Sequence, residues 1–398
     1  MILYYKLRAF VVTWLLRLLP RQAPIVFKGP DSMLTLSEQA AVLGFKKVII
    51  VTDGFLAQSG LLDGMQQALQ QHGVDYVIYD GVRPNPSFDQ VVEAEALLAR
   101  EGCEAVIAVG GGSVLDAAKM AALLHTNPGP LRKFDGIQKA KNPPLPILAV
   151  PSTAGTGAEV TLAAVITDPD THRKIPVVDT KLIPGYIALD PNLMKGLPPG
   201  ITASTGMDAL THAVESYLAT SSVASTEVQA KAAIRLIFSY LLRAYRDGED
   251  VEAREAMALA AFYAGAAFDR TSVGYVHGVA HQLGRVCDTP HGTANAMVLP
   301  EVLAAYGDSV HGRLAELAKV AGTAGPGESV QQQANGFIEA IRRLRMEMDM
   351  PLKPEKLDRQ AIPEMVTETI KETGALYPVP RYFHRSEITG LFEALLAE

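Results

Sequence analysis

The 398-residue sequence predicts two domains of different class, a parallel α/β domain in the first half and an all-helical domain in the second. Short Val- and Ile-rich runs alternate with helix-length amphipathic stretches up to Asp190, a pattern typical of a parallel sheet covered on both faces by helices. After Pro198-Pro199-Gly200 the chain consists of alanine-rich helical stretches without a convincing strand. We therefore expect a helical extension at 1–22, the α/β domain at 23–198 and the helical domain at 199–398.

Composition excludes several classes of protein. The apolar content of 48% is that of a soluble globular chain, and the net charge of −7 leaves no basic surface for a nucleic acid. Two cysteines, Cys103 and Cys287, are too few for a disulfide framework and fit a reducing, cytoplasmic compartment.

The first twenty residues are apolar, but Arg8 and Arg17 interrupt them and Pro20 ends them. They are too short and too charged to span a bilayer, and no small-residue cleavage site follows them. We expect an amphipathic helix that packs on the body of the protein or on a partner subunit; contact with a membrane surface is the alternative.

The elements of the first domain follow from the apolar pattern. Buried strands are expected at 47–53, 76–79, 105–110 and 145–150, and helices at 61–72, 88–101 and 113–124. The turn after the third strand is Gly110-Gly111-Gly112-Ser113, which lets a backbone approach a pyrophosphate at a helix N-terminus, as in Rossmann-like domains. Leu115 stands where the third glycine of the common fingerprint belongs, and tight packing is an alternative reason for the glycines.

Polar residues follow the other strands too. Asp53 ends the first strand, where a carboxylate accepts hydrogen bonds from an adenosine ribose and repels a 2′-phosphate; a simple turn before Gly54 is the alternative. In the common fingerprint the acid follows the glycine loop, whereas Asp53 precedes it. Hydroxyl groups for a phosphate or ribose are offered by Ser152, Thr153 and Thr156, and Asn85 lies where it could reach the same ligand; ordinary loop and turn chemistry explains these residues equally well.

Histidines mark the second domain, where helices are expected at 204–219, 223–245, 251–268, 275–284, 293–305, 311–322, 328–348 and 387–397. His277 and His281 are four residues apart and share a helix face, as do Asp208 and His212, and a loop after Pro290 could return His291 to them. Imidazoles with one carboxylate suit iron or zinc better than calcium or magnesium. Packing of the histidines, and capping of a first helical turn by Thr205 with Asp208, are the alternatives.

A metal facing a nucleotide loop across a cleft between the domains predicts redox chemistry. The cation would bind an alcohol oxygen and favour the alkoxide, whose carbon releases hydride to a nicotinamide. In the reverse direction it would polarise a carbonyl, and the sequence offers no nucleophile with a paired base that would favour hydrolysis.

Three long segments carry a family resemblance: Thr202 to Glu215, Val276 to Gly284, and Asp288 to Pro300. Together with Gly110 to Ser113, Asp116 and Ser152 to Thr161, they closely resemble the iron-containing (group III) alcohol dehydrogenases, from about residue 23 to the C-terminus. The resemblance implies the dehydroquinate synthase-like architecture, a homodimer or larger homo-oligomer, and a small alcohol or aldehyde as substrate.

The resemblance also implies residue roles. It assigns metal ligation to Asp208, His212, His277 and His291, and leaves His281 as a catalytic neighbour that relays a proton. Cofactor contacts fall on Asp53, Asn85, Gly110, Gly111, Gly112, Ser113, Asp116, Ser152, Thr153, Thr156 and Lys174. The position of Asp53 favours NAD over NADP, and the presence of His212 favours iron over the zinc of glycerol-type relatives. A zinc polyol dehydrogenase and a dehydroquinate-synthase-like cyclase with bound NAD are the alternatives.

Overall fold

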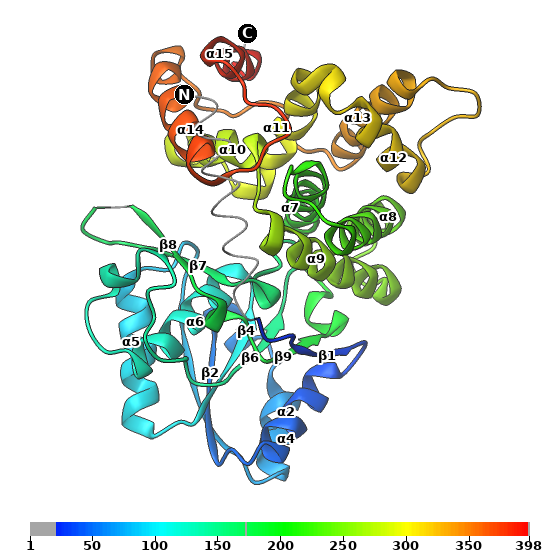
Figure 1. Ribbon diagram of the computed structural model, residues 1–398. Coiled ribbons are helices and arrows are strands. Elements are labelled where there is room, and N and C mark those ends of the chain that lie inside the picture. Colours follow the sequence, from blue (N-terminus) through cyan, green and yellow to red (C-terminus); the bar gives the residue numbers. More distant parts are fainter. Residues whose placement is uncertain (1–20, 172, 397–398) are drawn as a thin grey trace. The chain divides into compact units, whose positions relative to one another are not determined.

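The computed structural model describes residues 21–171 and 173–396, which divide into a unit that ends at Lys195 and a unit that begins at Gly196 (Figure 1). The predicted extension at 1–22 lies, apart from its last two residues, outside this described part. Among the described helices, none has both the length and the apolar content that a membrane span requires.

A six-stranded parallel sheet organises the first unit, in the order β1-β9-β6-β4-β2-β3. Its strands are β1 (Ile25–Lys28), β2 (Lys47–Asp53), β3 (Asp75–Val82), β4 (Ala105–Gly110), β6 (Ile147–Pro151) and β9 (Tyr186–Leu189). The central strands β4 and β6 are buried along their whole length, as a strand covered on both faces must be, whereas the edge strands β1 and β3 are partly exposed. The parallel sheet predicted from the Val/Ile runs is confirmed.

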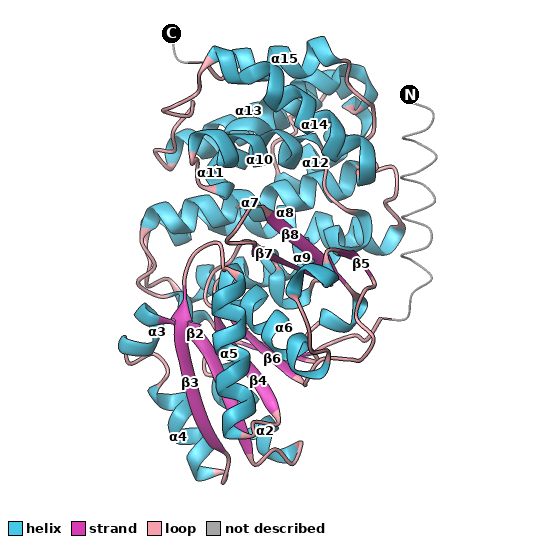
Figure 2. Cartoon of the chain, turned by 90° about the vertical axis from the view of Figure 1, so that its left-hand side faces the viewer, coloured by secondary structure: helices cyan, strands magenta, loops and turns pink. Residues whose placement is uncertain are grey.

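Helices cover both faces of this sheet (Figure 2). Helices α5 (Phe88–Glu101) and α6 (Gly112–Thr126) pack together on the face turned to the viewer in Figure 2, and α2 (Ser32–Val42) packs with α4 (Asp63–Gln71) on the other. The core beneath α2 and α4 includes alternate strand residues such as Ile50 and Ile107. The stretch predicted as one helix at 61–72 is shorter, and α3 (Gly54–Gln58) precedes it.

The order of the strands reverses next to β2. From β2 the chain passes to β3 on one side, then returns past β2 to β4 on the other side. In open parallel sheets such a reversal leaves a crevice outside the carboxyl ends of the two strands, and ligands bind there. Asp53 and the glycine loop, which stand at the ends of β2 and β4, therefore lie on either side of this reversal.

A second, three-stranded sheet was not expected from the sequence. It has the order β5-β8-β7, with β7 (Ala163–Thr167) antiparallel to β8 (Lys174–Val178), and β5 (Gly136–Ile137) is its third strand. These strands are short, and their alternate residues are exposed, so they lack the continuous apolar runs of the main sheet.

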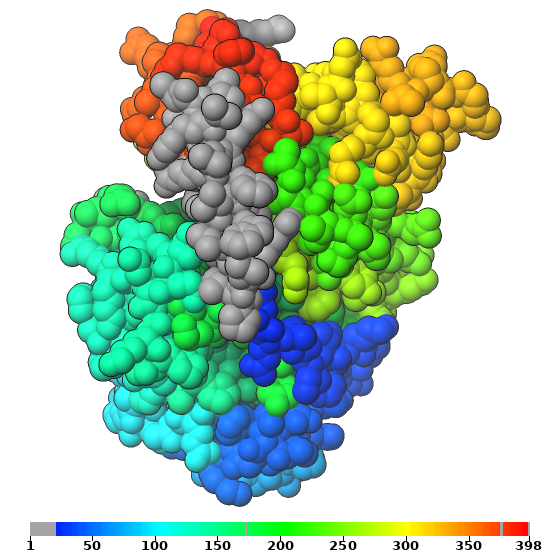
Figure 3. Space-filling view, in the orientation of Figure 1, coloured from blue at the N-terminus to red at the C-terminus, as the bar shows by residue number. Residues whose placement is uncertain are grey.

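The described residues of the second unit form helices joined by loops, with no strand among them, as predicted. Its helices are α7 (Pro199–Leu218), α8 (Ala224–Arg246), α9 (Val251–Thr271), α10 (Tyr275–Cys287), α11 (His291–Tyr306), α12 (His311–Ala321), α13 (Val330–Glu347), α14 (Ile362–Leu376) and α15 (Arg385–Ala394). No helix was predicted at α14. Helices α12 and α13 pack on each other and form the amber lobe that projects from this unit in Figure 3.

Candidate functional site

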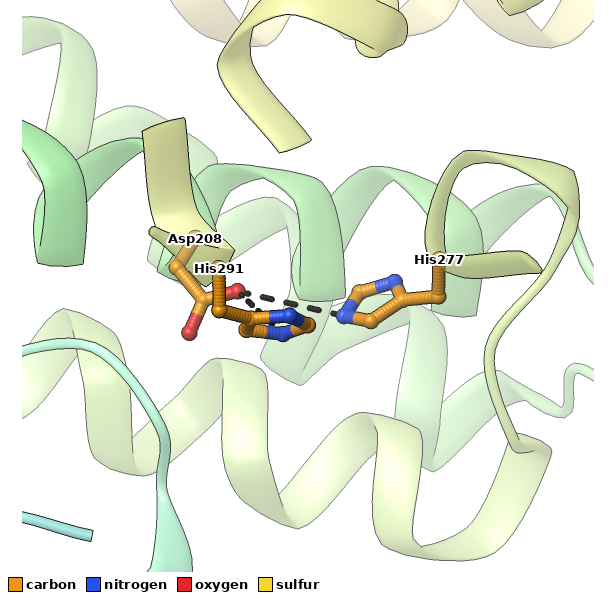
Figure 4. A group of neighbouring side chains, drawn as sticks. All are labelled: Asp208, His277 and His291. Carbon is orange, nitrogen blue, oxygen red and sulfur yellow. Dashed lines mark ion pairs between the residues drawn. The ribbon is translucent and has the colours of Figure 1, made fainter. Parts of the chain in front are cut away.

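Three of the predicted metal ligands meet inside the helical unit. Asp208 on α7, His277 on α10 and His291 on α11 point toward one another (Figure 4). The Oδ1 atom of Asp208 lies 3.8 Å from Nε2 of His277 and 3.4 Å from Nε2 of His291, and one donor atom of each residue lies within 4.8 Å of the others. Asp208 and His277 are buried.

The local structure explains how these side chains come together. Helix α7 begins at Pro199, so Thr205 and Asp208 lie beyond its first turn, and the hydroxyl of Thr205 donates to the carbonyl of Ile201. The capping interpretation of Asp208 is therefore wrong. His291 is the first residue of α11, directly after Pro290, rather than part of a returning loop.

The fourth predicted ligand, His212, lies beside this group. Its Nε2 is 3.9 Å from Oδ1 of Asp208, and its ring stacks between those of Phe268 and His277, with centroid distances of 4.2 and 4.7 Å. The structure thus gathers all four predicted ligands in one region of the helical unit, with three of them forming the tight group.

A buried carboxylate orients His277. Oε2 of Glu215 lies 2.6 Å from Nδ1 of His277, and the backbone N–H of Val276 donates to Oε1 of Glu215. Burial raises the pKa of Glu215 to about 7, against the lowering effect of backbone donors. Burial, followed by the neighbouring histidines, lowers the pKa of His277 well below its ordinary value and favours the neutral, ligating imidazole. When Glu215 is ionised, it accepts the Nδ1 proton and leaves the Nε2 lone pair facing Asp208.

His281 has a separate carboxylate partner. Its Nδ1 lies 2.6 Å from Oε1 of Glu372, an atom that also accepts a hydrogen bond from the hydroxyl of Tyr377. Burial tends to raise the pKa of Glu372, but the charge and hydrogen bond of His281 outweigh it and the pKa is lowered. An ionised Glu372 accepts the Nδ1 proton of His281 and leaves Nε2 to other partners. The rings of His281 and His291 stack at 5.3 Å, which places His281 at the margin of the ligand group.

In the other unit, the glycine loop lies against the loop that follows β6. A Cβ added at Gly110 would come within 2.6 Å of Val114, and one at Gly112 within 2.8 Å of Thr156. The position of Gly111 faces the Thr153 side chain at 3.5 Å. No described side chain caps the N-terminus of α6, and the N–H groups of Val114 and Leu115 donate to the Gly111 carbonyl, so those of Gly112 and Ser113 are the ones a phosphate could use. The glycines therefore satisfy a packing requirement, and the N-terminus of α6 that follows them is a candidate site for an anion.

Asp53 ends β2 and caps α3: its Oδ1 accepts from the backbone N–H groups of Phe55 and Leu56. The hydroxyl of Thr52 donates to the Val109 carbonyl and ties the end of β2 to the end of β4, so Asp53 lies next to the glycine loop. Asn85 follows β3 with a φ of 56° and an exposed side chain, as in a turn. The loop after β6 begins at Ser152, whose N–H donates to the Gly110 carbonyl.

Asp116 and Lys174 come close together at the side of α6. Oδ2 of Asp116 accepts from the N–H of Val165 in β7. Burial raises the pKa of Asp116 to about 6, although the charges of Lys119 and Lys174 lower it. Burial likewise lowers the pKa of Lys174, the first residue of β8, against the charge of Asp116.

The donor set fits a first-row divalent cation. It combines carboxylate oxygen with imidazole nitrogen, the mixture that iron and zinc accept, and it lacks the multiple oxygen ligands of calcium. Sequence reasoning missed three residues: Glu215 and Asn295 beside the ligand group, and Glu372 beside His281. The first two carry a helical signal, because Glu215 follows Asp208 by seven residues and Asn295 follows His291 by four. Glu372 lies on α14, which was not predicted.

Comparisons with known proteins agree along the chain. The profile of the family described as "Iron-containing alcohol dehydrogenase" matches residues 23–191, and "Fe-containing alcohol dehydrogenase family, C-terminal" matches residues 202–396. The 1,3-propanediol dehydrogenase of Klebsiella pneumoniae is 38% identical over 370 residues, 92% of this chain and 95% of that protein. The NAD-dependent methanol dehydrogenase of Bacillus methanolicus is 38% identical over 323 residues, 81% and 85% of the two chains. A crystal structure of a 1,3-propanediol oxidoreductase matches with a TM-score of 0.91 and 37% identity, and covers 96% and 100% of the two chains.

Proposed function

The chain belongs to the iron-containing alcohol dehydrogenase family, and we propose that it interconverts small primary alcohols and their aldehydes with NAD(H). The single observation that carries the proposal is the convergence of Asp208, His277 and His291 in a chain whose relatives are alcohol dehydrogenases. A substrate with one or two hydroxyl groups on a short carbon chain is supported by the relatives named for 1,3-propanediol and methanol.

The ligands of the cation are Asp208, His277 and His291, with His212 as the fourth. Iron(II) is the proposed ion, and zinc is the alternative that the same donors accept. A divalent cation held there supplies a Lewis acid that lowers the pKa of an alcohol and polarises a carbonyl. Glu215 keeps the Nε2 lone pair of His277 directed at the cation.

The NAD site is formed by the loops at the carboxyl end of the main sheet. The first turn of α6, from Gly111 to Ser113, offers backbone donors to the pyrophosphate, and the hydroxyls of Ser152, Thr153 and Thr156 lie on the adjoining loop. Asp53 has Oδ1 occupied by α3, and its other oxygen would accept from the ribose hydroxyls, where its charge would repel a 2′-phosphate. Asn85, Asp116 and Lys174 line the rest of the site.

His281 moves the hydroxyl proton. Glu372 fixes the imidazole through Nδ1, so that Nε2 is the atom that exchanges a proton with the alcohol or with water. We also propose that the enzyme works as a homodimer or larger homo-oligomer in the cytoplasm. Its domains are proposed at 23–198, for the α/β unit, and at 199–398, for the helical unit.

The test is an assay of NADH formation by anaerobically purified protein loaded with Fe²⁺ or Zn²⁺. Propane-1,3-diol and methanol should yield NADH, and metal-free protein should not. A preference for glycerol with Zn²⁺ would favour the polyol dehydrogenase, and no net NADH from any alcohol would refute the proposal. The Asp53→Gly variant adds an arm for the cofactor: its preference for NAD over NADP should fall at least tenfold.

A further inference from the structure

Asn295 contacts every donor atom of the tight ligand group. It lies one helical turn after His291 on α11 and is fully buried. Its Nδ2 donates to Oδ1 of Asp208 at 2.7 Å, and the same nitrogen lies 3.2 Å from Nε2 of His291 and 3.4 Å from Nε2 of His277. The carboxamide is therefore in direct contact with the oxygen and the two nitrogens that were assigned to the cation.

The amide oxygen of Asn295 makes no hydrogen bond that would stabilise the fold. Oδ1 of Asn295 is buried and has no hydrogen-bond partner among the described residues. The reversed amide would bring Oδ1 against the carboxylate oxygen of Asp208, two acceptors at hydrogen-bond distance, so the donor orientation is the stable one. A buried amide with an unsatisfied oxygen costs stability, and that oxygen makes no contact that would offset the cost. What this side chain supplies is the N–H that it donates to Asp208 in the ligand group.

We propose that Asn295 is a positioning residue of the metal centre, which holds the carboxylate of Asp208 in its ligating orientation by donating an N–H to Oδ1. This inference rests on the proposed metal site. It adds a determinant of metal affinity that lies outside the ligand set, on the helix that begins with a ligand. Because a fixed carboxylate loses less freedom when a cation binds, removal of the donor weakens binding.

The decisive variant is Asn295→Leu, which removes the donor and the unsatisfied oxygen together. Two quantities are measured: the dissociation constant for Zn²⁺, by competition with a chelator, and the midpoint of thermal unfolding of the metal-free protein. We expect the dissociation constant to rise about 10- to 100-fold. The metal-free midpoint should stay the same or fall, because the buried carboxylate of Asp208 then lacks its donor. A merely structural residue would lower the midpoint and leave the affinity for Zn²⁺ unchanged.

A second variant separates donation from ligation. Asn295→Asp keeps the shape of the side chain but replaces the NH₂ group by an oxygen, so it has no N–H for Asp208. Its affinity for Zn²⁺ should fall as in the Leu variant. Tighter binding would mean that residue 295 ligates the cation through an oxygen, and would overturn the positioning role.

Controls distinguish the inference from the site on which it rests. Thr369→Val removes a buried hydrogen bond to the Gly278 carbonyl, next to His277, but touches no donor atom, and it should leave the Zn²⁺ affinity unchanged. His277→Ala should abolish tight binding. If His277→Ala binds Zn²⁺ as the parent does, the metal centre itself is refuted. If only His277→Ala loses binding while both Asn295 variants retain it, the role of Asn295 alone is refuted.

Discussion

At the scale of single residues, the site depends on carboxylates that hold imidazoles in one orientation. Glu215 and Glu372 each lie 2.6 Å from an Nδ1 atom, the first on His277 and the second on His281. A histidine ligand whose second nitrogen is fixed in this way binds a metal more tightly. Both pairs join a carboxylate to an imidazole Nδ1, but only His277 belongs to the tight ligand group, so they form a natural pair of test and control.

Replacement of Glu215 by Gln should weaken the metal site. Gln has one acceptor oxygen, whereas Glu215 accepts from both the Val276 N–H and the His277 Nδ1–H, so one buried donor loses its partner. The dissociation constant for Zn²⁺ should rise about 10- to 100-fold, measured by chelator competition. The matched variant Glu372→Gln should bind Zn²⁺ as the parent does. Equal losses of affinity in both variants would contradict the assignment of His277, and not His281, as a ligand.

Ser272 is a strained residue between α9 and α10. Its backbone has φ 66° and ψ −177°, a region that glycine occupies without strain and that other residues avoid. Ser272→Gly should therefore raise the free energy of unfolding by about 1 kcal/mol, after the loss from the greater freedom of glycine in the unfolded chain. Denaturant unfolding measures the change. Ser272→Ala, which keeps the strain, should show no gain; a less stable Gly variant would contradict this reading of the junction.

The sequence was most informative about the ligands at this scale. Spacing alone brings Asp208 near His212 and His277 near His281, because residues four apart share a helix face. Spacing could not separate ligands from neighbours: His277 and His281 share a helix face, and the structure distinguishes them because His277 belongs to the tight group with Asp208 and His281 does not. The importance of Asn295 was equally hidden, since it depends on the side from which α11 meets α7.

At the scale of elements, the helix after the glycine loop is tied to the loop before β7 by buried charges. Lys119 on α6 is fully buried and donates to the carbonyls of Thr161 and Ala163. Glu159 lies nearby and is 2% exposed. Burial raises the pKa of Glu159 to about 7, although the charge of Lys119 lowers it.

This raised pKa predicts a pH dependence. The folded protein holds the Glu159 proton up to about pH 7, whereas the unfolded chain releases it near the ordinary pKa of 4.5, so the stability of the parent falls between those values as pH rises and is level above them. Glu159→Gln removes this loss. The free energy of unfolding of the variant minus that of the parent should increase by about 3 kcal/mol from pH 4.5 to pH 7. A difference that shrinks over this range would contradict the raised pKa.

Elements with a strong apolar period were predictable, and those defined by tertiary contacts were not. The strands at 47–53 and 105–110 were predicted with the bounds of β2 and β4, because a fully buried strand is a continuous apolar run. The strands β7 and β8 have alternate exposed residues and pair only with each other and β5. Helix α14 packs chiefly on α10 and α15. Its apolar residues Ile362, Met365, Val366 and Ile370 have helical spacing, but Thr and Glu residues outnumber them, and the helix was missed.

At the scale of the whole molecule, the proposed cation and the proposed nucleotide are assigned to residues of different units. The cation is assigned to residues from Asp208 to His291, and the nucleotide to residues from Asp53 to Lys174, on either side of the division between Lys195 and Gly196. Each unit has its own core and its own binding residues. Removal of the cation should therefore leave the affinity for the nucleotide largely intact, and the reverse.

The most direct test is the metal content of the parent and of His277→Ala, purified anaerobically with Fe²⁺ and measured by elemental analysis, with NADH affinity measured on the same samples by fluorescence titration. The parent should hold an equivalent of metal that dialysis does not remove, and the variant should hold essentially none while binding NADH within about threefold of the parent. A variant that retains the full equivalent of tightly bound metal would show that Asp208, His277 and His291 do not form the metal centre.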